Sequence, residues 1–156
     1  MKLLGFLDSQ AIVTELESSA KEAAIHELVE AALSTGAFDA ADKDKIIAQV
    51  LEREARGSTG LGGGVALPHV KGTEHVKELC GAFARSTRGL EYNAVDGAPV
   101  HVLFLILSPP GAIDSHIDIL KKISEVSKNE HYLSSFRRAK DQEAMGLLIG
   151  GLRGAT

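Results

Sequence analysis

The most apolar stretch of the chain runs from Val100 to Leu107 and ends at the turn sequence Ser108–Gly111. Its β-branched content favours a strand, and its nearly continuous apolar character predicts a strand that is buried on both faces. Such a strand has to lie at the centre of a sheet with covering layers. This stretch therefore predicts a domain organised around one central strand.

Segments with helical periodicity lie on both sides of this stretch and can supply the covering layers. Helices are expected from Ser19 to Gly36, from Asp39 or Asp42 to just before Gly57, after Asp114 or Ser115 with Ile117, Leu120 and Ile123 inward, over 130–136, and over 141–152. Further strands are expected at Val65–Leu67 and Val76–Ala84. The alternation predicts a single layered α/β domain over 1–156, with a mixed β-sheet flanked by helices on both faces.

Composition excludes several classes of function. The chain has 156 residues, a net charge of −4, 4% aromatic residues and one cysteine. The negative charge gives no electrostatic basis for nucleic-acid binding, and a lone cysteine fits a reducing compartment. The N-terminus has no signal-peptide pattern, and no segment approaches the roughly 20 apolar residues of a membrane span. We therefore expect a cytoplasmic protein that is not inserted in a membrane.

A glycine-rich segment after the second expected helix is the first candidate site. Its glycines are Gly57, Gly60, Gly62, Gly63 and Gly64. The hydroxyls of Ser58 and Thr59 and the backbone amides from Gly60 to Gly64 are suitable donors for a bound phosphate. Pro68 is expected to end the strand that follows, which puts His69 beside this segment. Imidazole is a nucleophile with a pKa near neutral pH, so His69 is the candidate reactive residue.

Two other residues are expected to face His69. Arg53 lies in the last turn of its helix, at the edge of the apolar stripe, and its guanidinium can clamp phosphate oxygens. His116 lies in the first turn of the third helix, where the helix dipole favours the neutral ring. Structural roles are open for all of these residues: His69 could simply finish a strand, Arg53 could complement a helix C-terminus, and Ser58 and Thr59 could serve a turn. Thr59 is also a candidate partner for the ring of His69.

The ordered run Arg53-Glu54, Ser58-Thr59-Gly60 and Gly64-Val65-Ala66-Leu67-Pro68-His69 resembles the signature of a known family. It is similar to the fructose/mannitol-type enzyme IIA domains of the bacterial sugar phosphotransferase system (PTS), which include the nitrogen-regulatory IIA proteins. The resemblance covers nearly the whole chain and implies that His69 accepts a phosphoryl group. It implies that Arg53 stabilises charge and that His116, in its His-Ile-x-Ile-Leu context, donates a hydrogen bond. No cofactor or metal is implied.

The same resemblance implies the partners of a phosphocarrier. The donor would be phosphorylated HPr or a nitrogen-branch paralogue of HPr. It would dock on an apolar rim formed by Leu61, Val65, Val70, Ile113 and Ile117. The phosphoryl group would then pass to a IIB cysteine for sugar transport or act as a signal to regulatory targets. The lack of IIB or IIC segments in these 156 residues favours the regulatory branch.

Two alternatives of other classes remain open. Many family members have glycine after the reactive histidine, where this chain has Val70, so the fold could serve as a binding module without phosphoryl transfer. His69 and His116 could instead bind a metal ion, although no cysteine or carboxylate in the sequence clearly completes four ligands. The other histidines and Cys80 have no convergent partners in the sequence, and structural roles are expected for them.

Overall fold

The computed structural model describes residues 2–152. Within this range the elements are β1 (Lys2–Leu3), β2 (Leu7–Asp8), β3 (Ile12–Val13), α1 (Lys21–Ser34), η1 (Ala40–Asp42), α2 (Lys43–Ala55), β4 (Gly60–Gly62), β5 (Val65–Ala66), β6 (His69–Lys71), β7 (Cys80–Leu90), β8 (Val100–Ser108), η2 (Pro110–Ala112), α3 (Ile113–Val126), α4 (Glu130–Arg138) and α5 (Gln142–Gly151). None of the helices in this range combines the length and the apolar character that a membrane crossing requires.

Strand β8 is the centre of a six-stranded mixed sheet, as the sequence predicts. It pairs antiparallel with β7 on one side and parallel with both β5 and β6 on the other. Beyond these, β3 pairs parallel with β7, and β4 pairs antiparallel with β5. The order β3-β7-β8-β5-β4, with β6 also on β8, brings the glycine-rich segment alongside the central strand.

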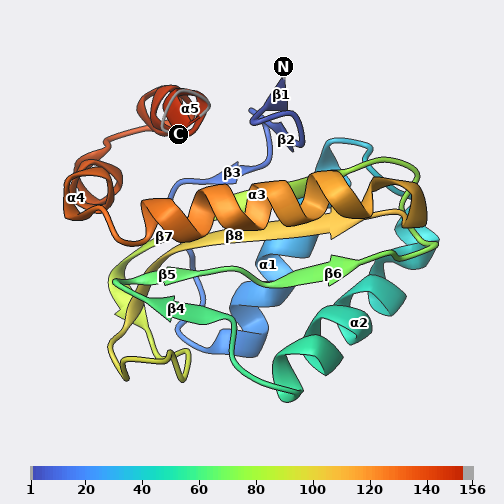
Figure 1. Cartoon of the computed structure of the whole chain (residues 1–156), viewed down its shortest axis with the longest axis horizontal. Coiled ribbons are helices and arrows are strands. Elements are labelled where there is room, and N and C mark those ends of the chain that lie inside the picture. The colour runs from blue at the N-terminus through green and yellow to red at the C-terminus, as the bar shows by residue number, and fades with distance from the viewer. Residues whose placement is uncertain (1, 153–156) are drawn as a thin grey trace.

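Helices cover both faces of this sheet, which confirms the predicted layers (Figure 1). Helix α3 crosses one face, and α1 and α2 lie on the other. Helix α4 belongs to the α3 side, because Phe136 packs against Phe83 and Phe104 with ring centroids 5.2 Å and 6.3 Å away. The site described below lies where β6 passes between α2 and α3.

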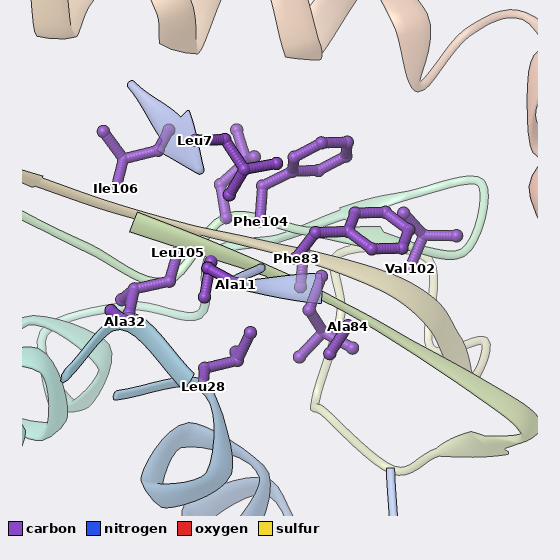
Figure 2. Close-up of a cluster of buried hydrophobic side chains, with 14 of the residues drawn as sticks. Leu7, Ala11, Leu28, Ala32, Phe83, Ala84, Val102, Phe104, Leu105 and Ile106 are labelled. Carbon is purple, nitrogen blue, oxygen red and sulfur yellow. The ribbon is translucent and has the colours of Figure 1, made fainter. Parts of the chain in front are cut away.

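Alternation along β7 and β8 divides the core into two layers (Figure 2). Phe83 and Phe104 stand on the face covered by α3 and α4, whereas Ala84 and Leu105 face Leu28 of α1. All five side chains are fully buried, and burial of each large apolar side chain contributes about 2 kcal/mol. These two layers hold β8, and with it the strand that carries His69, in a fixed position.

One strand prediction needs correction, and strand β3 was not predicted. The strand expected at Val76–Ala84 is β7, which begins at Cys80 and continues to Leu90. Val76 is buried, but it reaches the core from the loop before β7, so its apolar character did not mark a strand. The structure also has the short strand β3 in the N-terminal segment, held by its parallel pairing with β7 rather than by local sequence.

The helix starts also differ from the capping predictions. Helix α1 begins after Ala20 rather than Ser19, and α3 begins after Ala112, upstream of Asp114 and Ser115. Neither α2 nor η1 has a side-chain cap from Asp42 or Asp39. The residues buried on α3 are His116, Ile119, Ile123 and Val126, while Ile117 and Leu120, which were expected to face inward, are only partly buried.

Candidate active site

Strand β5 ends at Ala66, before Pro68, as predicted, but pairing with β8 resumes in β6, whose first residue is His69. His69 lies opposite Ile106 of β8 in a parallel ladder. Proline lacks an N–H, but its carbonyl remains an acceptor, and the Ile106 amide donates to Pro68 O at 3.1 Å. Pro68 therefore separates β5 from β6 without releasing the chain from β8. The backbone of His69 is thus fixed by the sheet.

The ring of His69 has one nitrogen occupied and one available. Its Nδ1 lies 2.7 Å from Leu67 O. Because a carbonyl oxygen only accepts, Nδ1 must carry the hydrogen, which leaves the lone pair on Nε2. Burial lowers the pKa of His69, and the charges of Arg53 and Lys71 add to this. The neutral, nucleophilic form of the ring is therefore favoured at neutral pH.

A cleft of about 430 Å³ opens beside His69. Its lining comes from α2 and β6 and consists of Gln49, Glu52, Arg53, Arg56, His69, Val70 and Lys71. Arg53 faces the segment after its helix, as predicted, and its Nη1 donates to Gly57 O at 2.8 Å. With Arg56 and Lys71, the cleft has three cationic side chains against the one carboxylate of Glu52, so it suits an anion.

His116 packs against His69 from the α3 side. The two ring centroids are 5.4 Å apart, with the ring planes at 60°. His116 is fully buried and does not line the cleft, and neither of its ring nitrogens has a hydrogen-bond partner among residues 2–152. Burial, together with the nearby His69 and Lys71, lowers the pKa of His116 to about 4. The second ring is therefore neutral and has a free hydrogen-bonding capacity.

The glycine-rich segment forms a hairpin rather than an open cradle. Positive φ angles at Gly62, Gly63 and Gly64 form its turn, a conformation that glycine adopts without strain. The Gly63 amide donates to Asp96, and the Gly60 amide donates to Ser58 Oγ at 3.1 Å.

Ser58, Thr59, Gly60 and Gly64 do not line this cleft, so their binding of a phosphoryl group stays a prediction. The Ser58 hydroxyl instead donates to Tyr92 O at 3.1 Å, and Gly64 O accepts from the amides of His101 and Val102.

Thr59 does not bond the ring of His69 either. Its hydroxyl donates to the buried carboxylate of Glu54, which Lys21 and Tyr92 also contact. The sequence motif contains both Glu54 and Thr59, but only the fold shows that they face each other rather than the cleft.

The residues expected to form a docking rim fall into two groups. Leu61 and Ile113 are both 36% exposed, and Val70 and Ile117 are partly exposed. Ile113 also lies near β6, since a Cβ at Gly72 would be 3.5 Å from its Cδ1. Val65 is fully buried in β5 and has no surface for a partner, because its strand is covered on both faces.

Sequence reasoning missed several cleft residues that simple spacing identifies. Gln49 and Arg56 are four before and three after Arg53, so they share its helix face. Lys71 is two residues after His69 in the same strand, which places both side chains on one face of β6. The sequence contains these spacings, but they identify cleft residues only when the bounds of α2 and β6 are known.

Other histidines and the metal alternative find no support at this site. His75 pairs with Asp42 at 3.2 Å, and the Nδ1 of His101 lies 2.9 Å from Ser86 O. Within residues 2–152, no group of three or more His, Cys, Asp or Glu side chains is arranged to hold a metal ion. His69 and His116 therefore lack a third ligand in the part of the chain that the structure describes.

Comparison with known proteins now decides the family. Residues 5–149 match the family described as "Phosphoenolpyruvate-dependent sugar phosphotransferase system, EIIA 2". The chain belongs to this EIIA 2 family. It is accordingly a component of a phosphoryl-transfer relay.

Similar EIIA 2 proteins include both sugar-specific and regulatory members. The chain is 33% identical to the fructose-specific EIIA component of Haloferax volcanii over 87% of its own length and 86% of the relative's. It is 32% identical to a nitrogen regulatory protein of Bradyrhizobium diazoefficiens over 93% and 92%. It spans only 22% of the fructose-specific EIIABC component of Bacillus subtilis, at 32% identity over 93% of this chain.

The fold is also that of a solved EIIA 2 structure. The crystal structure of the nitrogen regulatory protein IIA-Ntr from Neisseria meningitidis aligns with a TM-score of 0.84 and 27% identity, covering 94% of this chain and 97% of that one. This agreement confirms the predicted fold class and the resemblance drawn from the motif.

Proposed function

We propose that His69 is the phosphoryl acceptor of this relay protein. The observation that carries the proposal is the state of the ring: Nδ1 is held by Leu67 O, and His69 lines a cleft with three cationic side chains. The lone pair of Nε2 attacks phosphorus in the phosphohistidine of HPr or of a nitrogen-branch HPr paralogue. The donor N–P bond breaks with its electron pair staying on the donor ring, and the hydrogen on Nδ1 of His69 stays in place.

Charge stabilisation in this transfer is assigned to Arg53 and His116. The transferring phosphoryl group spreads negative charge over its oxygens, so fixed donors stabilise the transition state. Arg53 lines the cleft with its guanidinium oriented by Gly57 O. His116 is neutral and has two unpartnered ring nitrogens next to His69, and one N–H of this ring would donate to a phosphoryl oxygen.

The experiment is phosphorylation of the purified chain by enzyme I, HPr and labelled phosphoenolpyruvate. We expect an acid-labile label on the wild type and none on His69→Ala. His26→Ala is the control, because His26 is an exposed histidine on α1 and should leave labelling unchanged. An acid-stable label, or a label that persists in His69→Ala, would contradict the proposal.

Within the relay we favour the regulatory branch, in which the phosphorylation state governs binding to target proteins. The close structural match to the IIA-Ntr protein of Neisseria meningitidis supports this branch. The identity to the fructose-specific component of Haloferax volcanii supports the alternative, transfer to a IIB cysteine. Mixing the labelled protein with purified fructose IIB distinguishes them: rapid transfer of label supports transport, whereas phosphorylation-dependent capture of target proteins without transfer supports regulation.

A further inference from the structure

The carboxylate of Glu54 is buried and has hydrogen-bond donors on both oxygens. Only 7% of the residue is exposed. Its Oε2 accepts from Lys21 Nζ at 2.8 Å and from the Thr59 amide at 3.2 Å. Its Oε1 accepts from Tyr92 OH at 2.8 Å and from the hydroxyl of Thr59. Four donors from three residues thus converge on one side chain that does not line the cleft.

This cluster joins segments that are distant in the sequence. Lys21 is the first residue of α1, and its ammonium also donates to Tyr92 O at 3.2 Å and lies 4.3 Å from the centroid of the Tyr92 ring. Burial alone would raise the pKa of Glu54, but the hydrogen bonds from Lys21, Thr59 and Tyr92 together hold it below its ordinary value. Glu54 is therefore a buried anion that fixes the start of the hairpin to α1 and α2.

A continuous path of hydrogen bonds leads from this anion to the reactive ring. Glu54 binds both the amide and the hydroxyl of Thr59. The carbonyl of Thr59 accepts from the Leu67 amide at 3.1 Å, and the carbonyl of Leu67 accepts from His69 Nδ1 at 2.7 Å. The amide and the carbonyl of Thr59 belong to adjacent peptide groups joined at one Cα, and so do those of Leu67. The bonds therefore restrain the backbone of both residues on either side of that Cα.

We propose that Glu54 is a positioning residue for phosphoryl transfer, acting through Thr59 and Leu67 to hold the His69 ring with Nδ1 protonated and Nε2 free. The inference rests on the proposed function, because it assigns a role relative to His69 as acceptor. Glu54 does not touch the cleft and takes no part in the chemical step. It sets which nitrogen carries the lone pair and where that lone pair points.

A purely stabilising role explains this arrangement less well. Replacing a buried ion pair by apolar side chains is often neutral or stabilising, so the burial of Glu54 beside the partly exposed Lys21 is weak evidence for a stability function. Here the pair is linked through Thr59 to the backbone of Leu67, whose carbonyl selects the tautomer of His69. The Glu54 charge also opposes the lowering of the His69 pKa by burial.

The test measures the ring directly and transfer separately. The ring ¹⁵N shifts of His69 in the unphosphorylated protein, at a pH where the ring is neutral, report which nitrogen is protonated. The rate of phosphorylation by phospho-HPr is measured on the same samples. Glu54→Gln keeps the shape but offers only one acceptor oxygen and no charge to Lys21. We expect it to shift His69 towards the Nε2–H tautomer and to slow phosphorylation by about tenfold to hundredfold, as displacement of a reacting group does.

Variants of Thr59 keep the test decisive if Glu54→Gln folds poorly. Thr59→Val removes the hydroxyl bond to Glu54 and should shift the tautomer and the rate in the same direction. Thr59→Ser restores the hydroxyl and should lie closer to the wild type than Thr59→Val. The matched control is Glu30→Gln, which breaks an exposed carboxylate–lysine pair with Lys43, also 2.8 Å long, and should change neither readout.

The outcomes separate the inference from the proposed function. An unchanged His69 tautomer in both Glu54→Gln and folded Thr59→Val overturns the inference, even if the rate falls. An equal loss of rate in Glu30→Gln also overturns it. If the wild type takes no label on His69, the proposed function fails, and the ¹⁵N shifts still decide whether Glu54 fixes the ring.

Discussion

The ring of His116 meets the ring of His69 edge to face, with the centroids 5.4 Å apart and both nitrogens of His116 unpartnered among the described residues. Because burial and the neighbouring His69 and Lys71 lower its pKa to about 4, His116 stays neutral over the physiological range. Two neutral rings in contact avoid the repulsion that two imidazolium ions would have in a buried position.

The low pKa of His116, caused first by burial, makes the stability of the fold depend on pH in a defined direction. The unfolded chain binds a proton at His116 with an ordinary pKa near 6.5, whereas the folded chain does not until about pH 4. The stability that the neutral His116 ring contributes to the fold is therefore fully present above pH 6.5 and is lost as the pH falls towards 4. Between pH 7 and pH 5 we expect His116 to account for a loss of about 2 kcal/mol in the free energy of unfolding.

Urea denaturation at the two pH values checks this expectation. The loss on acidification should be smaller in His116→Gln, which cannot titrate, by that same amount. An NMR titration of the folded wild type should place the midpoint of His116 near 4 rather than near 6.5. A midpoint near 6.5 would show that the ring is not shielded as the structure indicates.

Arg53 offers a prediction about rate rather than stability. Its guanidinium is oriented by Gly57 O and lines the cleft with His69. Arg53→Ala removes a fixed donor to the transferring group, so we expect the phosphorylation rate by phospho-HPr to fall by about 10²- to 10³-fold. Arg53→Lys should recover only part of this, because an ammonium cannot reproduce the planar fork. Arg88→Gln, an exposed change on β7, is the control; an Arg53→Ala rate close to that of the control would remove Arg53 from the mechanism.

The central strand and the helical layers were predictable because their sequence patterns are local. The apolar residues from Val100 onward need burial on both faces wherever they lie, and β8 occupies that position. Strand β6 was not predictable in the same way. The missing N–H of Pro68 suggested an end, but its carbonyl still bonds Ile106, and this depends on a strand more than 30 residues further along the chain.

The residues of the candidate site also differ in whether local sequence patterns predict their positions. Arg53 and His69 could be placed together because each stands at the end of an element next to the same segment, and His116 because its helix begins after β8. The role of Thr59 could not be inferred from spacing. Its partner Glu54 points inward only because Lys21 and Tyr92 supply the other donors, and their convergence is a property of the tertiary structure.

Arg85 should be a large contributor to stability although it is charged. Its side chain is buried; Nε donates to Thr14 O at 3.1 Å, and Nη1 donates to Phe136 O at 3.1 Å and to Ala139 O. It thereby ties β7 to the N-terminal segment and to the end of α4. Arg85→Met leaves these carbonyls without their donor, and we expect the free energy of unfolding to fall by about 2–4 kcal/mol.

Arg88→Met on the same strand is the matched control for this change. Arg88 is exposed, so its substitution should stay within about 0.5 kcal/mol of the wild type in urea denaturation. Equal effects of the two substitutions would mean that the carbonyls near Arg85 are satisfied in another way.

Gly81 lies where the backbones of β7 and β8 leave no room for a Cβ atom. A Cβ at this position would lie 1.9 Å from Leu105 O and 2.8 Å from Cε2 of Phe6. The first of these atoms belongs to the backbone of the central strand, so it cannot move without disturbing the ladder. We expect Gly81→Ala to lower the free energy of unfolding by about 3 kcal/mol or more, beyond the usual range for overpacking by one methyl group.

The control is Gly111→Ala, where a Cβ would have no neighbour within 4 Å and the effect should stay within about 0.5 kcal/mol. Urea denaturation of both variants measures the difference, and a Gly81→Ala protein as stable as Gly111→Ala would show that β7 and β8 are not held at this separation.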